Sequence, residues 1–340
     1  MPTINDVARI AKVANSTVSR ALRDDHRIAR ATRERIKEVA ESIGYRPNPM
    51  IAALMTQLRT AHPPAPTCNL AWLDFGRNAV EWKERPVQRA FYTGALDRAT
   101  KANYSLERVQ VRAPGMTPSR LAQVLRARNV RGVLVPYFED SNSLATSIPL
   151  PLDEFNIVSV GTPFRDPDLH FASNDQYESS RLAVLELHKL GYRRIGYVGA
   201  HVLEAAVHNR FSAGFYATAR FELGLDVPAP LFSGDRAEIT HWLRHSRPDA
   251  VITTHLNLIK MLRADGWRIP EELGVVSTHV DPDDEETSGI YQNSEQVGAA
   301  AVDTLIGQLS SSAQGVPAHP QGVLIPGIWM PGRTVRQLGK

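Results

Sequence analysis

The chain has 340 residues, a formal net charge of +3 and one cysteine, Cys68. A single cysteine excludes an intramolecular disulfide and suits the reducing environment of the cytoplasm. The sequence shows no secretory leader and no apolar run of about 18 residues, so we expect a cytoplasmic protein without a membrane span.

Helical spacing of apolar residues predicts three short helices within the first 45 residues. Thr3 can cap the first helix through its hydroxyl, and Gly44 stands where a left-handed cap is favoured after the third. The first two helices follow each other too closely for a strand between them. Their apolar stripes consist of Val7, Ile10 and Ala11, of Val18, Ala21 and Leu22, and of Ile36, Val39, Ala40 and Ile43.

Basic residues concentrate in this N-terminal head. Residues 1–60 hold eleven Lys and Arg against six Asp and Glu, a balance of +5, so the rest of the chain carries about −2. Six arginines lie on or just after the second helix, where DNA phosphates would run if that helix entered a major groove. They are Arg20, Arg23, Arg27, Arg30, Arg33 and Arg35. A solvated basic face is the alternative, and the helix-turn-helix spacing beside it favours DNA.

Three motifs, together with the spacing between them, carry a family resemblance: Asp6-Val7-Ala8, Thr17-Val18-Ser19-Arg20 and Gly44-Tyr45-Arg46-Pro47-Asn48. They resemble the lactose/galactose repressor (LacI/GalR) family of bacterial transcription regulators. The resemblance implies a three-helix helix-turn-helix DNA-binding domain at residues 1–46. It places Asn15, Ser16 and Arg20 against base edges, Thr17 among the same DNA-binding residues, and Thr3, Ser19 and Asn48 near backbone phosphates. Arg and Asn can bind guanine and adenine bidentately, which agrees with these positions.

The head departs from the family pattern at three positions. Lys12 stands where the family usually has Gly at the tight turn, and Ala14 and Ala29 stand where Ser usually caps the second and third helices. A missing cap costs about 1 kcal/mol. We therefore expect the free head to be looser than in related proteins and to fold fully only on DNA.

Residues 47–66 read as a linker that contains a short apolar helix between prolines. By resemblance this is the hinge helix, which pairs with its dimer mate and places Leu54 in the minor groove of the operator. Apolar wedges between base steps kink DNA at a cost of a few kcal/mol, recovered through added contacts. A helix packed permanently on the core is the alternative.

Residues 67–340 alternate buried strands with amphipathic helices, which indicates parallel sheets with right-handed crossovers. Strands are expected at 69–75, 104–109, 132–136, 156–161, 194–199 and 250–253, and helices at 89–103, 178–190, 211–223 and 256–266. The resemblance extends over this part and implies a bilobed α/β core, similar to periplasmic binding proteins, with two parallel sheets.

The same resemblance implies the boundaries of the lobes. The N-lobe is expected at about 67–161 and 293–323, and the C-lobe at about 162–290 and 326–340. The chain would then cross between lobes near 161–163, 289–292 and 324–326. A segment at 297–309 with apolar residues at helical spacing is expected to serve both the core and a homodimer interface.

Ligands of open α/β sheets bind at the carboxyl ends of the strands, and here the residues depart from the family. Phe211 holds the place of the usual effector-binding Arg, with Arg210 one step earlier. His255-Leu256 stands where the family has an Asn-Asp pair, and His279 stands where it has an Asp, so two carboxylates that would bind sugar hydroxyls are absent. An acidic ligand such as a sugar acid fits these changes. The candidate effector residues are Phe75, Arg210, His255, His279 and Gln292, with Asn209 and Asn257 as weaker candidates. A structural role is the alternative for either histidine.

These observations predict a DNA-binding regulator, a repressor, whose affinity for a palindromic operator is controlled by a small molecule, a sugar or sugar acid, bound between the lobes of a homodimer. Control by a corepressor or a protein partner is an open alternative. An enzyme is not expected, because the sequence has no zinc-protease, paired-cysteine, phosphate-loop or nucleophile-elbow motif. The acidic run at 281–286 lacks the glycine and spacing of a calcium loop, so neither a metal nor a cofactor is expected.

Overall fold

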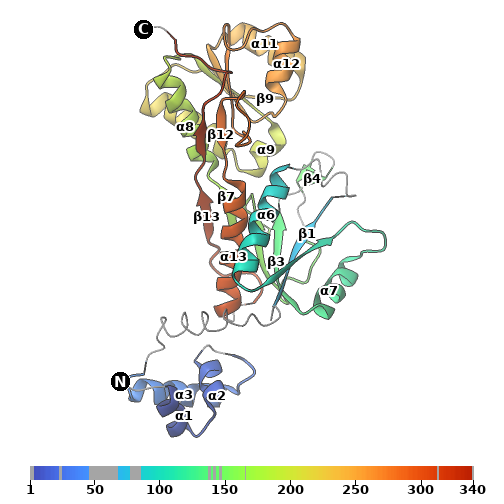
Figure 1. Ribbon diagram of the computed structural model, residues 1–340, viewed down its shortest axis with the longest axis vertical. Coiled ribbons are helices and arrows are strands. Elements are labelled where there is room, and N and C mark those ends of the chain that lie inside the picture. Colours follow the sequence, from blue (N-terminus) through green and yellow to red (C-terminus); the bar gives the residue numbers. More distant parts are fainter. Residues whose placement is uncertain are drawn as a thin grey trace.

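A computed structural model describes residues 4–22, 25–45, 68–76, 86–136, 139–140, 143–144, 148–164, 166–311 and 314–338. Within them the chain forms a small helical head and two α/β lobes (Figure 1). Thr3, Asn48, Leu54 and the hinge helix expected at 47–66 lie outside the described residues.

The head is built from the three helices that the apolar spacing predicts. They are α1 (Ile4–Ala11), α2 (Asn15–Ala21) and α3 (Arg30–Ser42). Val7, Val18 and Ile36, one from each helix, are fully buried in a shared core. Lys12 takes the turn between α1 and α2 with a φ of 52°. The turn therefore has the left-handed conformation that glycine adopts easily, although a lysine stands there. This conformation costs a residue with a Cβ about 1 kcal/mol or more.

The N-lobe is a six-stranded, all-parallel sheet in the order β13-β7-β6-β3-β1-β2. Its strands are β1 (Asn69–Asp74), β2 (Ser105–Gln110), β3 (Val130–Pro136), β6 (Asn156–Val160), β7 (His170–Asn174) and β13 (Gly322–Ile325). Helices α6 (Pro86–Lys101) and α13 (Ser294–Ser311) lie side by side on one face, and α7 (Pro118–Ala127) covers the other (Figure 1). A short hairpin, β4 (Glu139–Asp140) and β5 (Ser143–Leu144), lies apart from this sheet.

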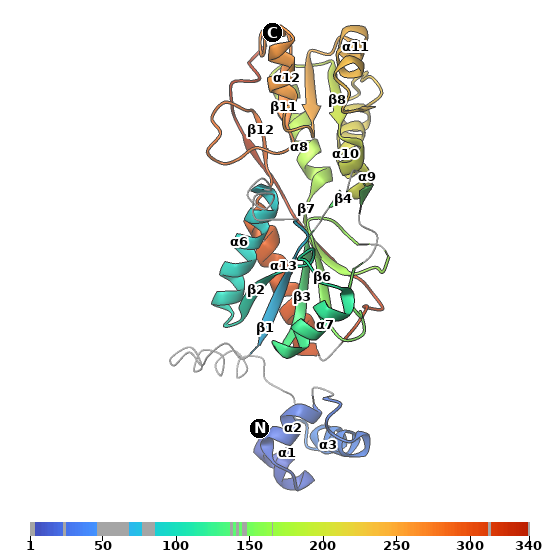
Figure 2. The ribbon, with the colours of Figure 1, turned by 90° about the vertical axis from the view of Figure 1, so that its right-hand side faces the viewer.

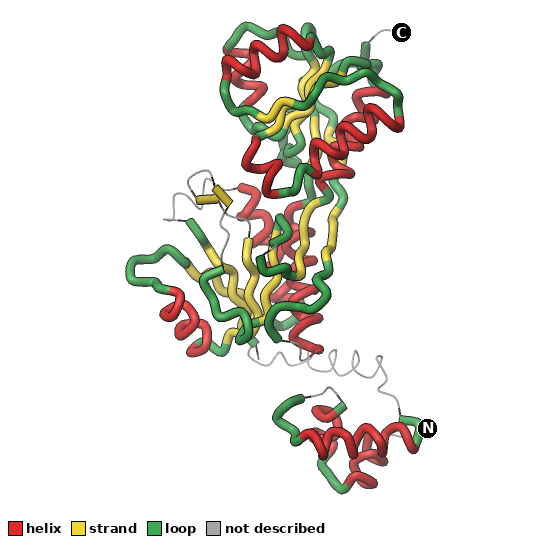
Figure 3. The backbone as a smooth tube through the Cα atoms, turned by 180° about the vertical axis from the view of Figure 1, so that it is seen from behind, coloured by secondary structure: helices red, strands yellow, loops and turns green. Residues whose placement is uncertain are grey.

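The C-lobe contains a second six-stranded sheet in the order β14-β12-β11-β10-β8-β9. Its strands are β8 (Ile195–Gly199), β9 (Leu231–Phe232), β10 (Ala250–Thr253), β11 (Gly274–Ser277), β12 (Gly289–Tyr291) and β14 (Ile328–Met330). All pair in parallel except β14, which runs antiparallel to β12. Figure 3 shows strands flanked by helices in both lobes.

The helices of the C-lobe divide between the two faces of its sheet. α8 (Gln176–Lys189) and α10 (Arg210–Ala217) pack on one face, and α11 (Arg236–Ser246) and α12 (Leu258–Ala264) pack on the other. α9 (His201–Ala206) follows β8, and a π-helical turn, η1 (Thr218–Glu222), continues α10. The carboxylates of Asp175 and Asp235 cap α8 and α11 by accepting a backbone N–H three residues on, as short polar side chains do at helix starts.

The chain passes between the lobes three times, and the first crossing differs from the prediction. It follows Asn174, because β7 pairs with β6 and β13 in the N-lobe sheet, and does not lie at 161–163. Figure 2 shows β7 where the lobes meet. The second crossing joins β12 to α13 and the third joins β13 to β14. Hydrogen bonds tie the crossings together, from Asp175 N to Ile325 O at 2.8 Å and from Asn293 Nδ2 to Pro326 O at 2.8 Å.

Candidate functional site

The helix expected to read DNA is α2, which carries Asn15, Ser16, Thr17, Ser19 and Arg20. Val18 and Ala21 are fully buried, whereas Thr17 is half-buried and Arg20 is exposed. Residues three apart lie on one face of a helix, so Thr17 and Arg20 share a face away from the head core. The side chains of Asn15, Ser16 and Ser19 lie outside the described part of the structure.

Several arginines of the head have partners within the head. Arg27 pairs with Asp25, and Arg30 pairs with Glu34. Arg33 donates to the carbonyl of Ile28 and Arg35 to the carbonyl of Ala11. Arg27 and Arg33 therefore stabilise the loop before α3, Arg35 links α3 to α1, and Arg30 forms an exposed pair within α3. From the sequence, these arginines were expected at DNA phosphates or on a solvated face, and these contacts were not expected.

His255 and His279 stand in equivalent positions on two neighbouring strands. Thr253 on β10 pairs with Ser277 on β11, and each histidine follows two residues later. The Thr253 hydroxyl accepts the backbone N–H of His255 at 3.0 Å, and the Ser277 hydroxyl accepts that of His279 at 3.1 Å. The same local turn therefore holds both histidines at one edge of the sheet.

We call this edge, which is formed by the carboxyl ends of β8, β10 and β11, the crossing edge of the C-lobe. Gln292 of the second crossing is 8% exposed, and its amide donates a hydrogen bond to the carbonyl of Thr278, directly before His279. The second crossing therefore contacts the loop that carries His279. Gln292 has this structural role whether or not it also contacts a ligand.

The imidazoles at the crossing edge contain buried nitrogens without partners. Nε2 of His255 and both ring nitrogens of His279 are buried and have no hydrogen-bond partner. Burial lowers the pKa of His279, and the charge of Asp281 only partly offsets this. The two groups are 3.8 Å apart, beyond hydrogen-bond distance. At neutral pH His279 is therefore an uncharged imidazole with one donor and one acceptor.

Arg210 is the first residue of α10, and its guanidinium is incompletely paired. Nη2 lies 3.5 Å from Oδ1 of Asp175 at the first crossing, and Nε is buried without a hydrogen-bond partner. Asn209, one of the weaker candidates, precedes it with a φ of 57° and makes no side-chain cap. Of these two residues, Arg210 contacts the first crossing, whereas Asn209 is exposed.

The two remaining candidates differ in their surroundings. Phe75, just after β1, is 5% exposed and belongs to the N-lobe core, so little of its surface is available to a ligand. Asn257 is exposed at the start of α12 and makes no side-chain cap. It lines a pocket of about 320 Å³ together with His255, Leu256 and Gly234. The wall of this pocket is mainly apolar.

A buried polar cluster behind the crossing edge was not expected. Glu204 of α9 is 1% exposed, and its carboxylate accepts hydrogen bonds from the hydroxyls of Tyr197 on β8 and Ser212 on α10. Burial raises the pKa of Glu204 and, with the adjacent carboxylate, raises that of Tyr197 well above its usual value. The cluster fixes α9 and α10, and hence Arg210, against the sheet. No spacing in the sequence connects these three residues.

A sequence signal for the paired histidine turns was available. Thr253-Thr254-His255 and Ser277-Thr278-His279 repeat one pattern, a hydroxyl residue followed two positions later by histidine, at the ends of two buried strands. Hydroxyl side chains commonly accept a backbone N–H two residues on. The repeat indicates equal turns at equal places in the sheet.

Comparison with known proteins matches both halves of this architecture. The family described as "Bacterial regulatory proteins, lacI family" matches residues 3–48, and the "Periplasmic binding protein-like domain" matches residues 184–335. The chain combines a LacI-family helix-turn-helix domain with a periplasmic-binding-protein-like domain. It is a DNA-binding transcriptional regulator with a helix-turn-helix head and a periplasmic-binding-protein-like core.

Two bacterial regulators are similar to this chain over most of its length. The HTH-type transcriptional regulator CelR of Thermobifida fusca is 26% identical over 331 residues, covering 91% of this chain and 92% of CelR. The HTH-type transcriptional regulator PtxS of Pseudomonas plecoglossicida is 27% identical over 332 residues, covering 91% of this chain and 90% of PtxS.

Solved structures share the fold. A CelR–cellobiose complex has a TM-score of 0.58 at 22% identity and covers 98% of this chain and 100% of that one. A lac repressor dimer bound to operator and the anti-inducer ONPF has a TM-score of 0.56 at 18% identity, with 98% and 99% covered. In the described part of this chain, none of the helices is both long enough and apolar enough to span a bilayer.

Proposed function

We propose that this LacI-family chain is a homodimeric repressor whose affinity for a palindromic operator is controlled by an acidic sugar bound between the lobes. Arg210, His255, His279 and Gln292 supply the polar contacts, and Phe75 contributes only the small part of its ring that the N-lobe core leaves exposed. On the DNA side, α2 reads bases through Asn15, Ser16, Thr17 and Arg20. Thr3, Ser19 and Asn48 bind phosphates, and Leu54 enters the minor groove.

The observation that supports the ligand site is that three of the candidate residues carry unpartnered buried polar atoms. In the described part of the chain eight such side-chain atoms occur, and four belong to Arg210, His255 and His279. Each buried polar atom left without a partner costs about 1 to 3 kcal/mol. A ligand that pairs these atoms removes that cost, which favours binding at this place over the rest of the lobe.

The chemistry of the donors indicates the class of ligand. Arg210 is permanently cationic and is suited to a carboxylate or phosphate, which it binds with two hydrogen bonds. The neutral imidazole of His279 offers one donor and one acceptor, which matches a sugar hydroxyl. A polyhydroxy compound with one anionic group therefore fits the set better than a neutral sugar.

The relatives support a ligand of the sugar type in general. CelR has been solved as a complex with cellobiose, and several relatives carry the name HTH-type transcriptional repressor. We extend these properties to this chain as a proposal. Two carboxylates usual in the family are absent here, where His255-Leu256 and His279 stand in their place, and this is the reason for choosing an acidic sugar.

A binding experiment on the full chain tests the ligand class. The probes are glucuronate and gluconate as acids and glucose as the neutral control, measured by calorimetry and thermal shift. We expect the acids to bind and to change the affinity for a DNA duplex selected from a random pool with the full chain. Binding of glucose without binding of either acid would contradict the proposal. The direction of the change separates an inducer from a corepressor.

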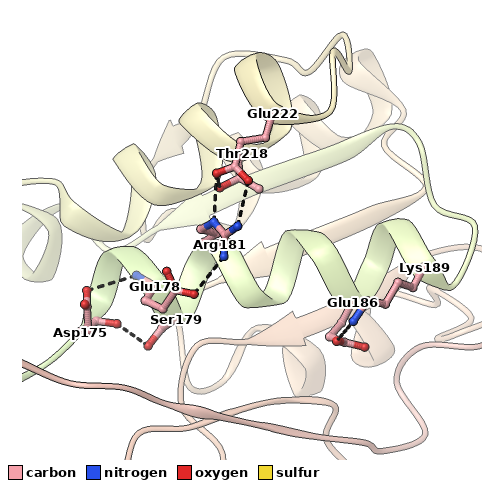
Figure 4. A network of polar contacts seen from close by, with 8 residues as sticks. All are labelled: Asp175, Glu178, Ser179, Arg181, Glu186, Lys189, Thr218 and Glu222. Atoms are coloured by element: carbon pink, nitrogen blue, oxygen red, sulfur yellow. Dashed lines mark hydrogen bonds and ion pairs between the residues drawn. The ribbon is translucent and has the colours of Figure 1, made fainter.

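A pair of arginine variants tests the site. Arg210→Gln should weaken binding of the acids by about tenfold or more, because a charge-assisted hydrogen bond contributes about 1.5 to 3 kcal/mol. Arg181→Gln is the matched control, since Arg181 pairs with Glu178 on α8 and with Glu222 on η1 (Figure 4). Equal losses in the two variants would remove Arg210 from the proposed site.

A further inference from the structure

We propose that Asp175 couples an acidic effector to the lobe crossings, because it occupies part of the Arg210 edge that the effector's anionic group needs. This inference rests on the proposed function of the crossing edge and specifies how that site would control the lobes. The acidic group and Asp175 compete for one guanidinium, and Asp175 belongs to the first crossing.

Other arginines of this chain show what a complete pairing looks like. Arg126 binds the carboxylate of Glu154 through Nε at 2.6 Å and Nη2 at 2.7 Å. Arg181 binds Glu222 through the same two nitrogens at 3.0 and 3.1 Å. Both use the Nε/Nη2 edge, the side-on arrangement that suits a carboxylate.

The corresponding edge of Arg210 is only half used. Nη2 lies 3.5 Å from one oxygen of Asp175, at the limit of a hydrogen bond, and Nε has no hydrogen-bond partner although it is buried. The Arg210 side chain is still 37% exposed, so the group can be reached from solvent. A carboxylate that binds side-on needs Nε and Nη2 together, and therefore competes with Asp175 at Nη2.

Asp175 is also held by the crossings and by the start of α8, through its backbone and through the same Oδ1 that faces Arg210. Its backbone N–H donates to Ile325 O of β13 at 2.8 Å, next to the end of the β7–β13 pairing. Its carboxylate caps α8 by accepting the N–H of Glu178 at 3.2 Å, and its carbonyl accepts the hydroxyl of Ser179 at 2.6 Å (Figure 4). The position of Asp175 is thus set by two crossings and by the start of α8.

These contacts give an anion a preference between lobe arrangements. With the anion on Arg210, the Asp175 carboxylate faces a like charge, which disfavours any arrangement that keeps Asp175 close to Arg210. A ligand shifts a conformational equilibrium only through such a difference in affinity. A neutral sugar creates no like charge at this place, so it leaves the pair of Arg210 and Asp175 unchanged.

The decisive variant is Asp175→Asn, which removes the charge and keeps a side chain that caps helices as well as Asp does. We expect the affinity of the full chain for glucuronate to rise about twofold to fivefold, the range for a partly exposed charge pair. The factor by which glucuronate changes operator affinity should fall. Glu222→Gln, which neutralises an arginine-paired carboxylate next to α8, is the control and should change neither quantity.

A second measurement needs no effector. If Asp175 and Arg210 act on the crossings as one pair, Asp175→Asn, Arg210→Gln and the double variant should change the operator affinity of the free protein by the same factor. Independent, additive changes would overturn the coupling.

The outcomes separate this inference from the proposed function. Absence of binding of glucuronate and gluconate by the unchanged protein would contradict the proposed function. Binding that depends on Arg210, together with an Asp175→Asn variant whose affinity and coupling equal those of the unchanged protein, would overturn the role of Asp175 alone.

Discussion

Alanine stands at the N-cap, directly before the first helical residue, of both α2 and α3. The alanine before α3 offers a clean test of how stable the free head is. Ala29 precedes α3 with a φ of −54° and a ψ of 140°, and its side chain makes no cap. Replacing it with serine adds a hydroxyl within reach of the N–H of Thr32, three residues on. Thr117 already does this for Arg120 at the start of α7, with an Oγ1 to N distance of 3.2 Å.

The expected gain is about 1 kcal/mol, the usual effect of a capping hydroxyl over alanine. That gain corresponds to about a fivefold change in the equilibrium between the open and folded head. Ala14 has the same lack of a cap before α2, with a φ of −69° and a ψ of 151°. With Ala14→Ser added, the gain should reach about 2 kcal/mol, or about thirtyfold, if the two caps act independently.

Amide hydrogen exchange on the full chain measures this equilibrium. In Ala29→Ser the amides of the head should exchange about fivefold more slowly, while those of the two lobes stay unchanged. Ala31→Ser is the matched control, because Ala31 lies inside α3, where serine lacks the cap geometry and slightly disfavours the helix. Equal exchange in Ala29→Ser and the unchanged protein would refute the view that missing caps loosen the head.

Three further predictions follow from single positions. Lys12→Gly should stabilise the head by about 1 kcal/mol, because glycine adopts the left-handed turn without the Cβ penalty; unchanged amide exchange of the head would contradict this. Gly298→Ala should destabilise the N-lobe by about 3 kcal/mol, since its Cβ would lie 1.9 Å from the carbonyl oxygen of Phe91. Gly307→Ala, on the same helix with nothing within 4 Å of the added Cβ, should be neutral or slightly stabilising, and equal urea midpoints for the two variants would refute the packing argument. The pKa of His279 is lowered by burial, so the unfolded chain binds a proton more readily and stability should fall as the pH drops through about 6.5. His279→Asn should reduce the loss of urea resistance between about pH 7.5 and about pH 5.5, and an unchanged loss would count against it.

The head and the two parallel sheets could be predicted because their signals are local. Apolar residues three and four apart define α1, α2 and α3, and continuous apolar runs define strands such as β3 and β10. Each signal depends only on neighbouring residues and on which side chains a buried element tolerates. The order of strands within a sheet has no such local signal, and the edge strand β14 shows this, because it runs antiparallel to an otherwise parallel sheet.

The first lobe crossing was misplaced for a physical reason. Gly161 and Pro163 follow a buried strand and read as the exit from a lobe. In the structure Gly161 adopts a φ of 90°, and its N–H donates to the carbonyl of Ala172, so the chain turns back into the same sheet. The returning strand β7 has the sequence His-Phe-Ala-Ser-Asn, whose polar ends do not read as a buried strand. Only its pairing with β6 and β13 identifies it.

The site was partly predictable, and the unpredictable part is its set of partners. Strand ends place His255 and His279 at one edge, since ends of adjacent parallel strands meet there. That Arg210 has a free Nε, or that Gln292 is engaged with the carbonyl of Thr278, depends on side-chain positions set by distant segments. Periodicity and spacing carry no information on such contacts.

The candidate ligand-binding groups are distributed unevenly between the two lobes. Arg210, His255 and His279 belong to the C-lobe and Gln292 to a crossing, whereas Phe75, the candidate from the N-lobe, is almost fully buried in its own core. A ligand held mainly by the C-lobe gains little from closing the N-lobe over it through Phe75. Control of the lobes must then come from the crossings, where a change at Arg210 reaches Asp175 and, through its backbone, β13. On the proposed site, the charge of the ligand, more than its apolar surface, is therefore the property expected to decide operator affinity.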